Sequence, residues 1–221
     1  MQAATHDVRA VVFDLDGVLI DSEPIWEDVR KRYVSEAGGT YAPTATRDIM
    51  GMSAPEWSHY LRTRLGVSRS QERINHDVVE RVAAALRAHV PLLPGAVAAV
   101  QRLAERWPLG LASSSNRSLI ELVLELTRLR GCFWAVVSSE EVPHGKPAPD
   151  VYLRAAELLG IAPERCCAVE DSSNGIRAAK AAGLRTIAIP NAHFPPAPEV
   201  VALADVVLPS LFALTPERVV S

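Results

Sequence analysis

Short apolar runs recur along this chain, and each is followed by a segment whose apolar residues have helical spacing. Two parallel strands must be joined by a crossover connection, usually a helix, so this alternation is typical of a parallel sheet. The predicted strands are Ala10 to Phe13, Leu109 to Ala112, Ala135 to Val137, Cys166 to Val169, Thr186 to Ile189 and Val206 to Leu208. The predicted helices between them are Ala96 to Arg106, Ser118 to Leu129, Val151 to Leu159 and Gly175 to Ala182. We therefore predict an α/β fold with a doubly wound parallel sheet.

The first connection is far longer than a crossover requires, because only helical signal follows the first strand as far as residue 91. Apolar residues recur at every fourth position along three segments, Ile25 to Ala37, Trp57 to Leu65 and Ile74 to Val90. Ser53 and Glu56 have the spacing of a capping box, which predicts where the second helix begins. We predict a helical domain over residues 22–91, inserted into a core made of residues 1–21 and 92–221.

Composition excludes several classes of protein. The chain has 221 residues, of which 48% are apolar, so overall disorder is not expected. A net charge of -3 without a basic run disfavours nucleic acid and anionic membranes as partners. No apolar run reaches the length of a secretory leader or a membrane span, so we expect a cytoplasmic protein, and we expect a monomer. Cys132, Cys166 and Cys167 lack CxxC spacing, which predicts buried, unreactive thiols instead of disulfides or a zinc site.

Polar residues follow four of the predicted strands, and open parallel sheets bind ligands beyond the carboxyl ends of their strands. After the first strand, Asp14 and Asp16 are two positions apart, so both carboxylates face the same side if the chain stays extended. Gly17 then allows a sharp turn. The two acids are candidates for a catalytic pair, although a turn made by Asp and Gly explains this segment alone equally well.

The second strand is followed by Ser113, Ser114, Ser115 and Asn116, directly before a predicted helix. Hydroxyl groups and free amides at a helix N-terminus can hold a phosphate group. Ordinary N-capping explains the same residues equally well.

The third strand is followed by a loop with two prolines, in which Lys146 presents a compact positive charge and Asp150 can cap the next helix. The chain has lysine only at Lys31, Lys146 and Lys180 and otherwise uses arginine. A lysine kept inside a stiffened loop favours a functional cation over a solvated surface side chain.

The fourth strand ends in Glu170 and Asp171, two adjacent acids. Their carboxylates repel each other unless a cation lies between them, and carboxylate oxygens suit Mg²⁺. A helix cap would explain one acid but less readily both. A nucleophilic carboxylate, a second acid, a phosphate cradle, a lysine and an acidic pair thus follow successive strands, which together favour phosphoryl transfer.

These residues closely resemble the haloacid dehalogenase superfamily over essentially the whole chain. The positions that match its four motifs are Asp14-Leu15-Asp16-Gly17, Ser113, Lys146 and Glu170-Asp171. The resemblance implies a Rossmann-like core with a helical cap after the first motif. The nearest branch contains β-phosphoglucomutase and the sugar-phosphate phosphatases.

The resemblance also implies residue roles. Asp14 would attack phosphorus and form an aspartyl-phosphate, while Asp16 would protonate the departing oxygen and then deprotonate the attacking water. The implied ligands of a Mg²⁺ cofactor are Asp14, the backbone carbonyl of Asp16, Glu170 and Asp171. The residues implied to bind and neutralise the phosphoryl group are Lys146, Ser113 and Ser114. The branches that cleave carbon–halogen and carbon–phosphorus bonds lack the second aspartate, so the substrate is expected to be a small phosphate ester.

Three functions remain open at this stage. A phosphatase acting on a small phosphorylated metabolite, such as a sugar phosphate, is favoured over a β-phosphoglucomutase, because Trp26 and Ala54 stand where that mutase has histidine and arginine. A silent phosphometabolite-binding protein is disfavoured by the intact Asp14 and Asp16. Trp26 is more readily explained by packing than by substrate stacking, and solvation is the simpler expectation for Arg47 and His59.

Overall fold

The computed structural model describes residues 6–221 except residues 51 and 192. Six strands form one sheet in the order β3-β2-β1-β4-β5-β6, and every neighbouring pair is parallel. The strands are β1 (Ala10–Phe13), β2 (Leu109–Ser113), β3 (Phe133–Ser138), β4 (Cys166–Glu170), β5 (Arg185–Ala188) and β6 (Val206–Val207). The strand order runs outward in both directions from β1 and β4, so the topological switch point lies between these two strands. The predicted Rossmann-like α/β class is confirmed.

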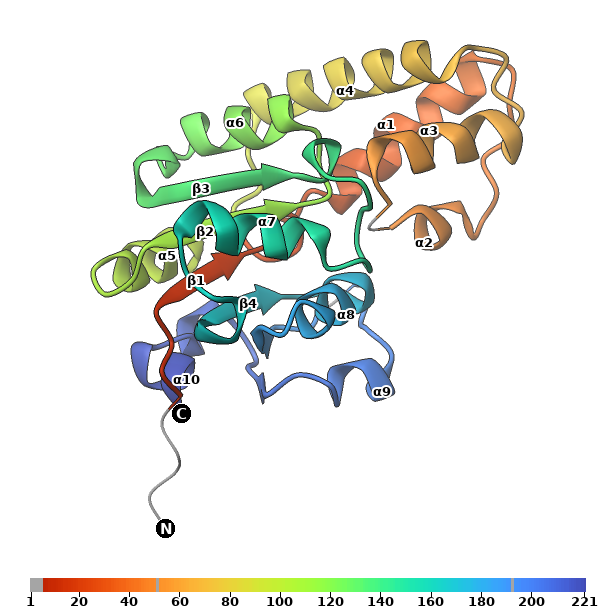
Figure 1. The fold of residues 1–221 in the computed structure, drawn as a ribbon. Helices are drawn as coiled ribbons and strands as arrows, with labels where there is room; N and C mark the ends of the chain where they lie inside the picture. Colours follow the sequence, from red (N-terminus) through yellow and green to blue (C-terminus); the bar gives the residue numbers. More distant parts are fainter. Residues whose placement is uncertain (1–5, 51, 192) are drawn as a thin grey trace.

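Helices cover both faces of this sheet (Figure 1). Those that connect the strands are α5 (Ala96–Ala104), α6 (Arg117–Leu126), α7 (Asp150–Leu159) and α8 (Ser173–Ala181). The shorter elements are α9 (Pro198–Val201), α10 (Pro216–Val220), and the 3-10 turns η1 (Arg130–Cys132), η2 (Ser139–Glu141), η3 (Pro163–Arg165) and η4 (Leu211–Ala213). The sequence pattern did not predict α9 and α10, because four or five residues are too few to show a helical period.

Alternation along the strands divides the core between the two faces. In β1, Val11 and Phe13 belong to the apolar cluster that includes α5 and α6, whereas Ala10 and Val12 belong to the cluster that includes α7 and α8. All four side chains are fully buried. Burial on both faces explains why these strands read as continuous apolar runs.

Four helices lie beyond the carboxyl ends of the strands: α1 (Glu23–Glu36), α2 (Ala45–Ile49), α3 (Ala54–Thr63) and α4 (Gln71–Ala88) (Figure 1). We call residues 23–88 the helical insertion. Its two connections to the sheet run side by side, since Ile20 forms an antiparallel bridge with Leu92 and the Asp21 amide donates to the Pro91 carbonyl at 2.8 Å. The boundaries predicted at residues 21/22 and 91/92 fall on these connections, and the division into two domains stays a prediction.

Local signals account for some helix ends. The capping box at α3 is present, with Glu56 accepting from the Ser53 amide at 2.8 Å. Asp150 was expected to cap α7 but is its first residue, and its carboxylate instead contacts His144 at 3.1 Å.

Helix α6 ends at Leu126, three residues before the predicted end. Arg128 has a left-handed φ of 60°, and the Leu129 amide donates to the Leu124 carbonyl at 2.9 Å, which is a Schellman ending. Glycine usually marks this position. An arginine there gave no stop signal in the sequence.

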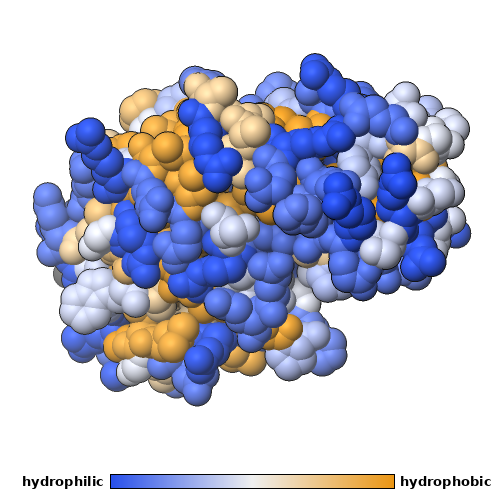
Figure 2. All heavy atoms as spheres, turned by 90° about the horizontal axis from the view of Figure 1, so that it is seen from above, coloured by the Kyte–Doolittle hydropathy of each residue, from blue (hydrophilic) through white to orange (hydrophobic). Residues whose placement is uncertain are grey.

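The outer surface carries many hydrophilic side chains, with hydrophobic atoms visible between them on the face drawn in Figure 2. No helix in the described part of the chain is long and apolar enough to cross a bilayer. Cys166 and Cys167 are fully buried, and burial raises the pKa of Cys166 to about 11 and that of Cys167 to about 12. Both thiols are therefore protonated near neutral pH, as predicted for unreactive packing residues, whereas Cys132 is only partly buried.

Candidate active site

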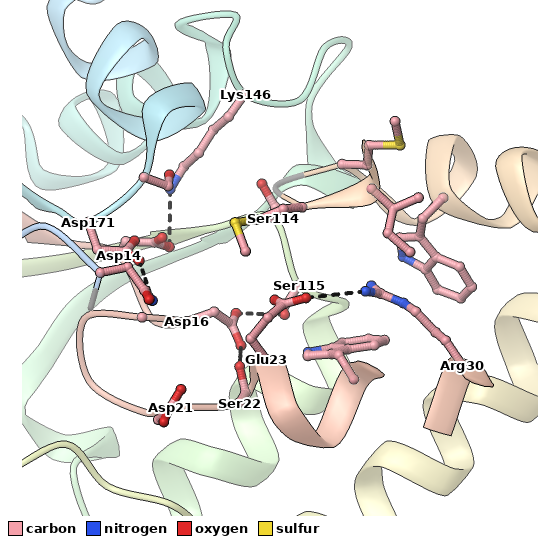
Figure 3. Close-up of a pocket in the computed structure, with 18 residues that line it drawn as sticks. Asp14, Asp16, Asp21, Ser22, Glu23, Arg30, Ser114, Ser115, Lys146 and Asp171 are labelled. Atoms are coloured by element: carbon pink, nitrogen blue, oxygen red, sulfur yellow. Dashed lines mark hydrogen bonds and ion pairs between the residues drawn. The ribbon is translucent and has the colours of Figure 1, made fainter. Parts of the chain in front are cut away.

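A pocket opens at the switch point of the sheet, between the carboxyl ends of β1 and β4 and the helical insertion (Figure 3). The lining residues that come from strand ends include Asp14, Asp16, Ser114, Lys146 and Asp171. The insertion contributes a second group of lining residues, including Glu23, Trp26, Arg30 and Trp57. The pocket therefore has a polar floor made by the sheet and a wall made by the insertion.

The segment after β1 alternates as its sequence predicts. Asp14 and Asp16 line the pocket, while Leu15 turns away into the apolar core and is 1% exposed. Gly17 has a φ of 79°, and a Cβ at this position would collide with the carboxylate of Asp171. Glycine is therefore required both by the backbone conformation and by the close approach of the second acidic segment.

Lys146 lies between two acids. Its Nζ donates to Glu170 Oε1 at 2.6 Å and lies 3.1 Å from Asp14 Oδ1, and the residue is 4% exposed. Burial alone would lower the pKa of Lys146, but the carboxylates of Asp14 and Glu170 outweigh burial and raise it. The lysine is therefore a buried, permanent positive charge and not a solvated surface group, while its functional role stays a prediction.

Glu170 is fully buried and accepts hydrogen bonds on both carboxylate oxygens. Oε1 accepts from Lys146 and from the Tyr152 hydroxyl at 2.7 Å, while Oε2 accepts from the amides of Asp171 and Ser172 at 3.0 and 3.3 Å. These contacts fix Glu170 under the N-terminus of α8, where a Cβ on Gly175 would collide with it. Glu170 is thus well placed to hold Lys146, and its predicted role as a metal ligand stays a prediction.

Tyr152 is not predicted from the sequence as a site residue, because a tyrosine in the apolar stripe of α7 looks like an ordinary core residue. Its ring is fully buried, and Lys146 Nζ lies 5.0 Å from the ring centroid. Burial, and then the nearby Glu170 carboxylate, raise the pKa of Tyr152 well above its usual value, so the hydroxyl remains a donor. The only available signal was that α7 directly follows the loop of Lys146.

Asp171 faces Asp14 across the pocket floor. Its Oδ2 accepts from Asn191 Nδ2 at 3.1 Å, whereas Oδ1 is buried and finds no hydrogen-bond partner among the described residues. Burial, and then the neighbouring Glu170 and Asp14, raise the pKa of Asp171 well above its usual value. Asn191 follows β5, a fifth strand end that sequence analysis did not include.

Asp14 has similar surroundings. Burial raises the pKa of Asp14 to about 8, with Lys146 opposing the rise and Glu170 adding to it. Oxygen atoms of Asp14, Glu170 and Asp171 lie within 4.8 Å of one another. Buried carboxylates that resist ionisation are the electrostatic arrangement that a divalent cation relieves.

The donor set fits the predicted Mg²⁺. Hard oxygen ligands are what this ion prefers, and Asp171 Oδ1 offers one that no described residue uses. Of the three clustered acids, Asp14 and Asp171 line the pocket, whereas both oxygens of Glu170 are engaged by protein donors. The residues present therefore fit a magnesium ion held mainly between Asp14 and Asp171.

Asp16 is held by three hydroxyl groups. Its Oδ2 accepts from Ser115 at 2.7 Å and from Ser113 at 3.3 Å, and its Oδ1 accepts from Ser22. Ser22 immediately precedes α1, so the first residue before the helical insertion helps to orient the second acid of the pair. The sequence pattern did not predict that Ser22 and Ser115 contact Asp16.

The serine segment after β2 is built differently from the expected phosphate cradle. Glu140 of η2 accepts from the Arg117 amide at 2.8 Å, so a carboxylate already occupies the first turn of α6. Ser113 is fully buried, and its hydroxyl accepts from the Ser115 amide at 3.0 Å. Ser114 Oγ, in contrast, is buried beside the pocket without a hydrogen-bond partner among the residues described. The Ser114 hydroxyl is therefore more available than that of Ser113 to bind a ligand. Phosphate binding by Ser113 stays a prediction.

The wall made by the insertion holds a buried arginine. Arg30 is 5% exposed, and its guanidinium carbon lies 4.5 Å from the ring centroid of Trp26 and 5.5 Å from that of Trp57. Its Nη1 lies 3.7 Å from Glu23 Oε1. Trp26 both packs against Trp57 and lines the pocket, so packing and pocket contact occur together. Arg47 is exposed and lies outside this pocket, and His59 lines a separate surface hollow.

A doubly wound sheet with a buried acidic centre and a lysine at its switch point is typical of an α/β enzyme that binds its ligand there and whose chemistry depends on carboxylates. The chain belongs to the haloacid dehalogenase-like hydrolases: the model of that family matches residues 8–183. The resemblance found in the four motifs is therefore confirmed. The chain is an enzyme of this family.

Several named proteins are similar over four fifths or more of this chain. Hexitol phosphatase B of Escherichia coli K12 is 38% identical over 216 residues, covering 95% of this chain and 96% of that protein. A phosphorylated carbohydrates phosphatase of Thermotoga maritima is 34% identical over 184 residues, covering 81% and 84% of the two chains. Among solved structures, CbbY from Rhodobacter sphaeroides in complex with phosphate has a TM-score of 0.83 at 27% identity and covers 94% of this chain and 96% of its own.

Proposed function

We propose that this chain is a Mg²⁺-dependent phosphatase that hydrolyses a small phosphorylated sugar through an aspartyl-phosphate on Asp14. The observation that carries this proposal is the position of Asp14, 3.1 Å from Lys146 and in an acid cluster with Asp171 at the pocket floor. The similarity to phosphatases named for hexitols and phosphorylated carbohydrates supports the substrate class.

In the first half-reaction, an Asp14 oxygen attacks phosphorus and the bond between phosphorus and the ester oxygen breaks. Asp16 donates a proton to the departing oxygen, which leaves as the sugar hydroxyl. In the second, Asp16 removes a proton from water, the water oxygen attacks phosphorus, and inorganic phosphate leaves Asp14 free. Lys146 and the Ser114 hydroxyl bind phosphoryl oxygens and neutralise their charge.

Magnesium, held by Asp14 and Asp171, would supply further positive charge beside the phosphoryl oxygens. The three hydroxyls around Asp16 keep its carboxylate turned toward the leaving group. The helical insertion covers the pocket and limits the access of bulk water, which favours transfer within the site.

The central test is an assay with Mg²⁺ over a panel of phosphorylated hexoses, hexitols and other small phosphate esters. Phosphate release and isomer formation are measured in the same samples. We expect release from at least one sugar phosphate with little isomer formed. Isomer formation without release would instead indicate a mutase, and no conversion of any ester would contradict the proposal.

Replacing Asp16 by asparagine tests the acid/base role. We expect kcat to fall at least about 100-fold, because a positioned acid/base group contributes about 10² to 10⁴. Asparagine keeps one of the two oxygens that accept from serine, and a serine hydroxyl beside the new amide nitrogen can accept from it instead, so the fold should be retained. The thermal shift on adding Mg²⁺ should stay close to that of the wild type, and unchanged turnover would reject the role.

Replacing Asp171 by asparagine tests the metal site without relying on activity. The buried Oδ1, which has no hydrogen-bond partner among the described residues, becomes the position of a neutral amide. We expect the metal-free variant to be at least as stable as the wild type, since a buried carboxylate has been removed. Mg²⁺ should raise the melting temperature of the wild type but not of this variant. An equal shift in both proteins would place the ion elsewhere.

A further inference from the structure

Arg30 is placed where an arginine is unusual. It lies on the inner side of α1, one turn after Trp26 and one turn before Val34, and it is among the most deeply buried charged residues. The rings of Trp26 and Trp57 flank the guanidinium at 4.5 and 5.5 Å. These contacts stabilise the cation and fix its orientation, so the guanidinium nitrogens are held in one direction.

Two nitrogens of the Arg30 guanidinium are left without hydrogen-bond partners among the described residues. Within the described part of the chain, Arg30 Nε and Nη1 make no hydrogen bond, and neither does the buried Oε1 of Glu23. The Nη1 to Oε1 distance is 3.7 Å, too long for a hydrogen bond. Buried donors and acceptors are normally paired, so a donor and an acceptor left open side by side at a pocket wall indicate a site for a ligand.

The open pair lies on the leaving-group side of the reaction centre. Figure 3 shows Glu23 between Asp16 and Arg30, with Lys146 and Asp171 on the far side of Asp16. All of these residues line the same pocket. Because Asp16 is the proposed acid for the departing oxygen, Glu23 and Arg30 face the portion of the ester that departs.

The chemistry of the pair selects a hydroxyl group. A hydroxyl both donates and accepts, so one oxygen near the pair can donate to Glu23 Oε1 and accept from Arg30. A phosphate dianion or carboxylate has no proton to give and would face the Glu23 carboxylate. The charge of Arg30 is already matched by Glu23, and the pocket lining has five carboxylates, at Asp14, Asp16, Asp21, Glu23 and Asp171, against two cations, Lys146 and Arg30.

We propose that Glu23 and Arg30 bind a hydroxyl of the leaving group, next to the ester oxygen. The pair would thereby select monophosphates of uncharged polyols over bisphosphates and phosphorylated acids. This inference rests on the proposed phosphatase function and assigns its substrate specificity to two residues of α1. Trp26 and Trp57 serve as the support that holds the guanidinium in place.

The experiment compares kcat/KM for three kinds of ester. Sorbitol 6-phosphate and fructose 1-phosphate carry hydroxyls, propyl phosphate carries none, and fructose 1,6-bisphosphate adds a second dianion. The wild type should favour the hydroxyl-bearing monophosphates over both other kinds by at least about tenfold, the effect of one hydrogen bond to a charged group. The variants are Arg30→Met, which keeps the length of the side chain, Arg30→Lys, which keeps the charge, and Glu23→Gln.

In Arg30→Met the preference for sugar phosphate over propyl phosphate should fall at least about tenfold, and Arg30→Lys should recover only part of it, because lysine lacks the planar fork. Glu23→Gln should weaken the discrimination against the bisphosphate. The matched control is Arg47→Met, which removes an exposed arginine of the same insertion and should leave all ratios unchanged. Circular dichroism confirms that each variant is folded.

Two failures can be told apart. If the wild type and Arg47→Met release no phosphate from any ester, the proposed function itself is rejected. If they release phosphate but the ratios are the same in the Arg30 and Glu23 variants, or if the wild type prefers the bisphosphate, the selection of hydroxyls by this pair is rejected while the phosphatase stands. Isothermal titration of the same esters into Asp14→Asn, which should bind them without turnover, gives Kd values. The ratios of these Kd values between esters can be compared with the kcat/KM ratios of the wild type.

Discussion

Asp14→Asn is expected to abolish phosphate release, with kcat reduced by at least about 1,000-fold. An amide oxygen is a poor nucleophile and carries no charge for Lys146 to pair with, 3.1 Å away. Release of inorganic phosphate from the best ester of the panel, measured with Mg²⁺ at saturating substrate, checks this result. Residual turnover within tenfold of the wild type would show that another group attacks phosphorus.

The control for this variant is its stability without metal. The folded pKa of Asp14, about 8, lies above its ordinary value of 3.8, so the folded state binds this proton more tightly than the unfolded state. The stability gained from the bound proton is complete below about pH 4 and is lost as the pH rises toward 8. Metal-free Asp14→Asn should lack this loss and should be at least as stable as the wild type at pH 8. Lost activity combined with a stable fold then isolates the chemical role.

The sequence predicted the sheet well because its signals are local. Six apolar runs matched six strands, and β1 (Ala10–Phe13) has the predicted bounds. The acids at the ends of β1 and β4 converge because the carboxyl ends of adjacent parallel strands meet at one edge. The sequence did not give the strand order, which depends on the packing of helices distant in the chain.

The residues missed in the site are those whose role depends on distant partners. Tyr152 looks like a core residue until β4 brings Glu170 to its hydroxyl, and Glu140 looks like a surface acid until it accepts from the Arg117 amide. Arg30 is the clearest case, because Trp57, which lies across from it on α3, is far away in the sequence. Spacing along one helix predicts which face is buried but not what that face meets.

The acids of the site show why Lys146 matters beyond catalysis. Asp14, Glu170 and Asp171 are all less than 10% exposed, and Lys146 is the cation paired directly with two of them. Buried charges are tolerated when they are paired and hydrogen-bonded, and removal of one partner leaves the other uncompensated. Removal of the positive charge of Lys146 is therefore expected to destabilise the site.

Lys146→Met is accordingly expected to lose both stability and activity. The methionine side chain fills much of the same space but leaves the buried Glu170 carboxylate without its 2.6 Å partner. We expect the free energy of unfolding to fall by about 3–5 kcal/mol, as when one member of a buried ion pair is removed. Phosphate release should fall at least about 100-fold, because the phosphoryl oxygens lose a neutralising charge. Denaturant unfolding without metal and the panel assay measure the two effects.

Lys180→Met is the matched control, since it removes a lysine that also forms a close ion pair, with Asp205 at 2.8 Å, but at the surface. Its side chain is 33% exposed, and exposed pairs contribute about 0–1 kcal/mol, so both stability and turnover should change little. If the two variants lost equal stability, the buried acids would not depend on Lys146. If Lys146→Met were unstable only without Mg²⁺, the result would show that the metal and the lysine neutralise the same cluster of carboxylates. Either cation could then hold Asp14 in its ionised, nucleophilic form.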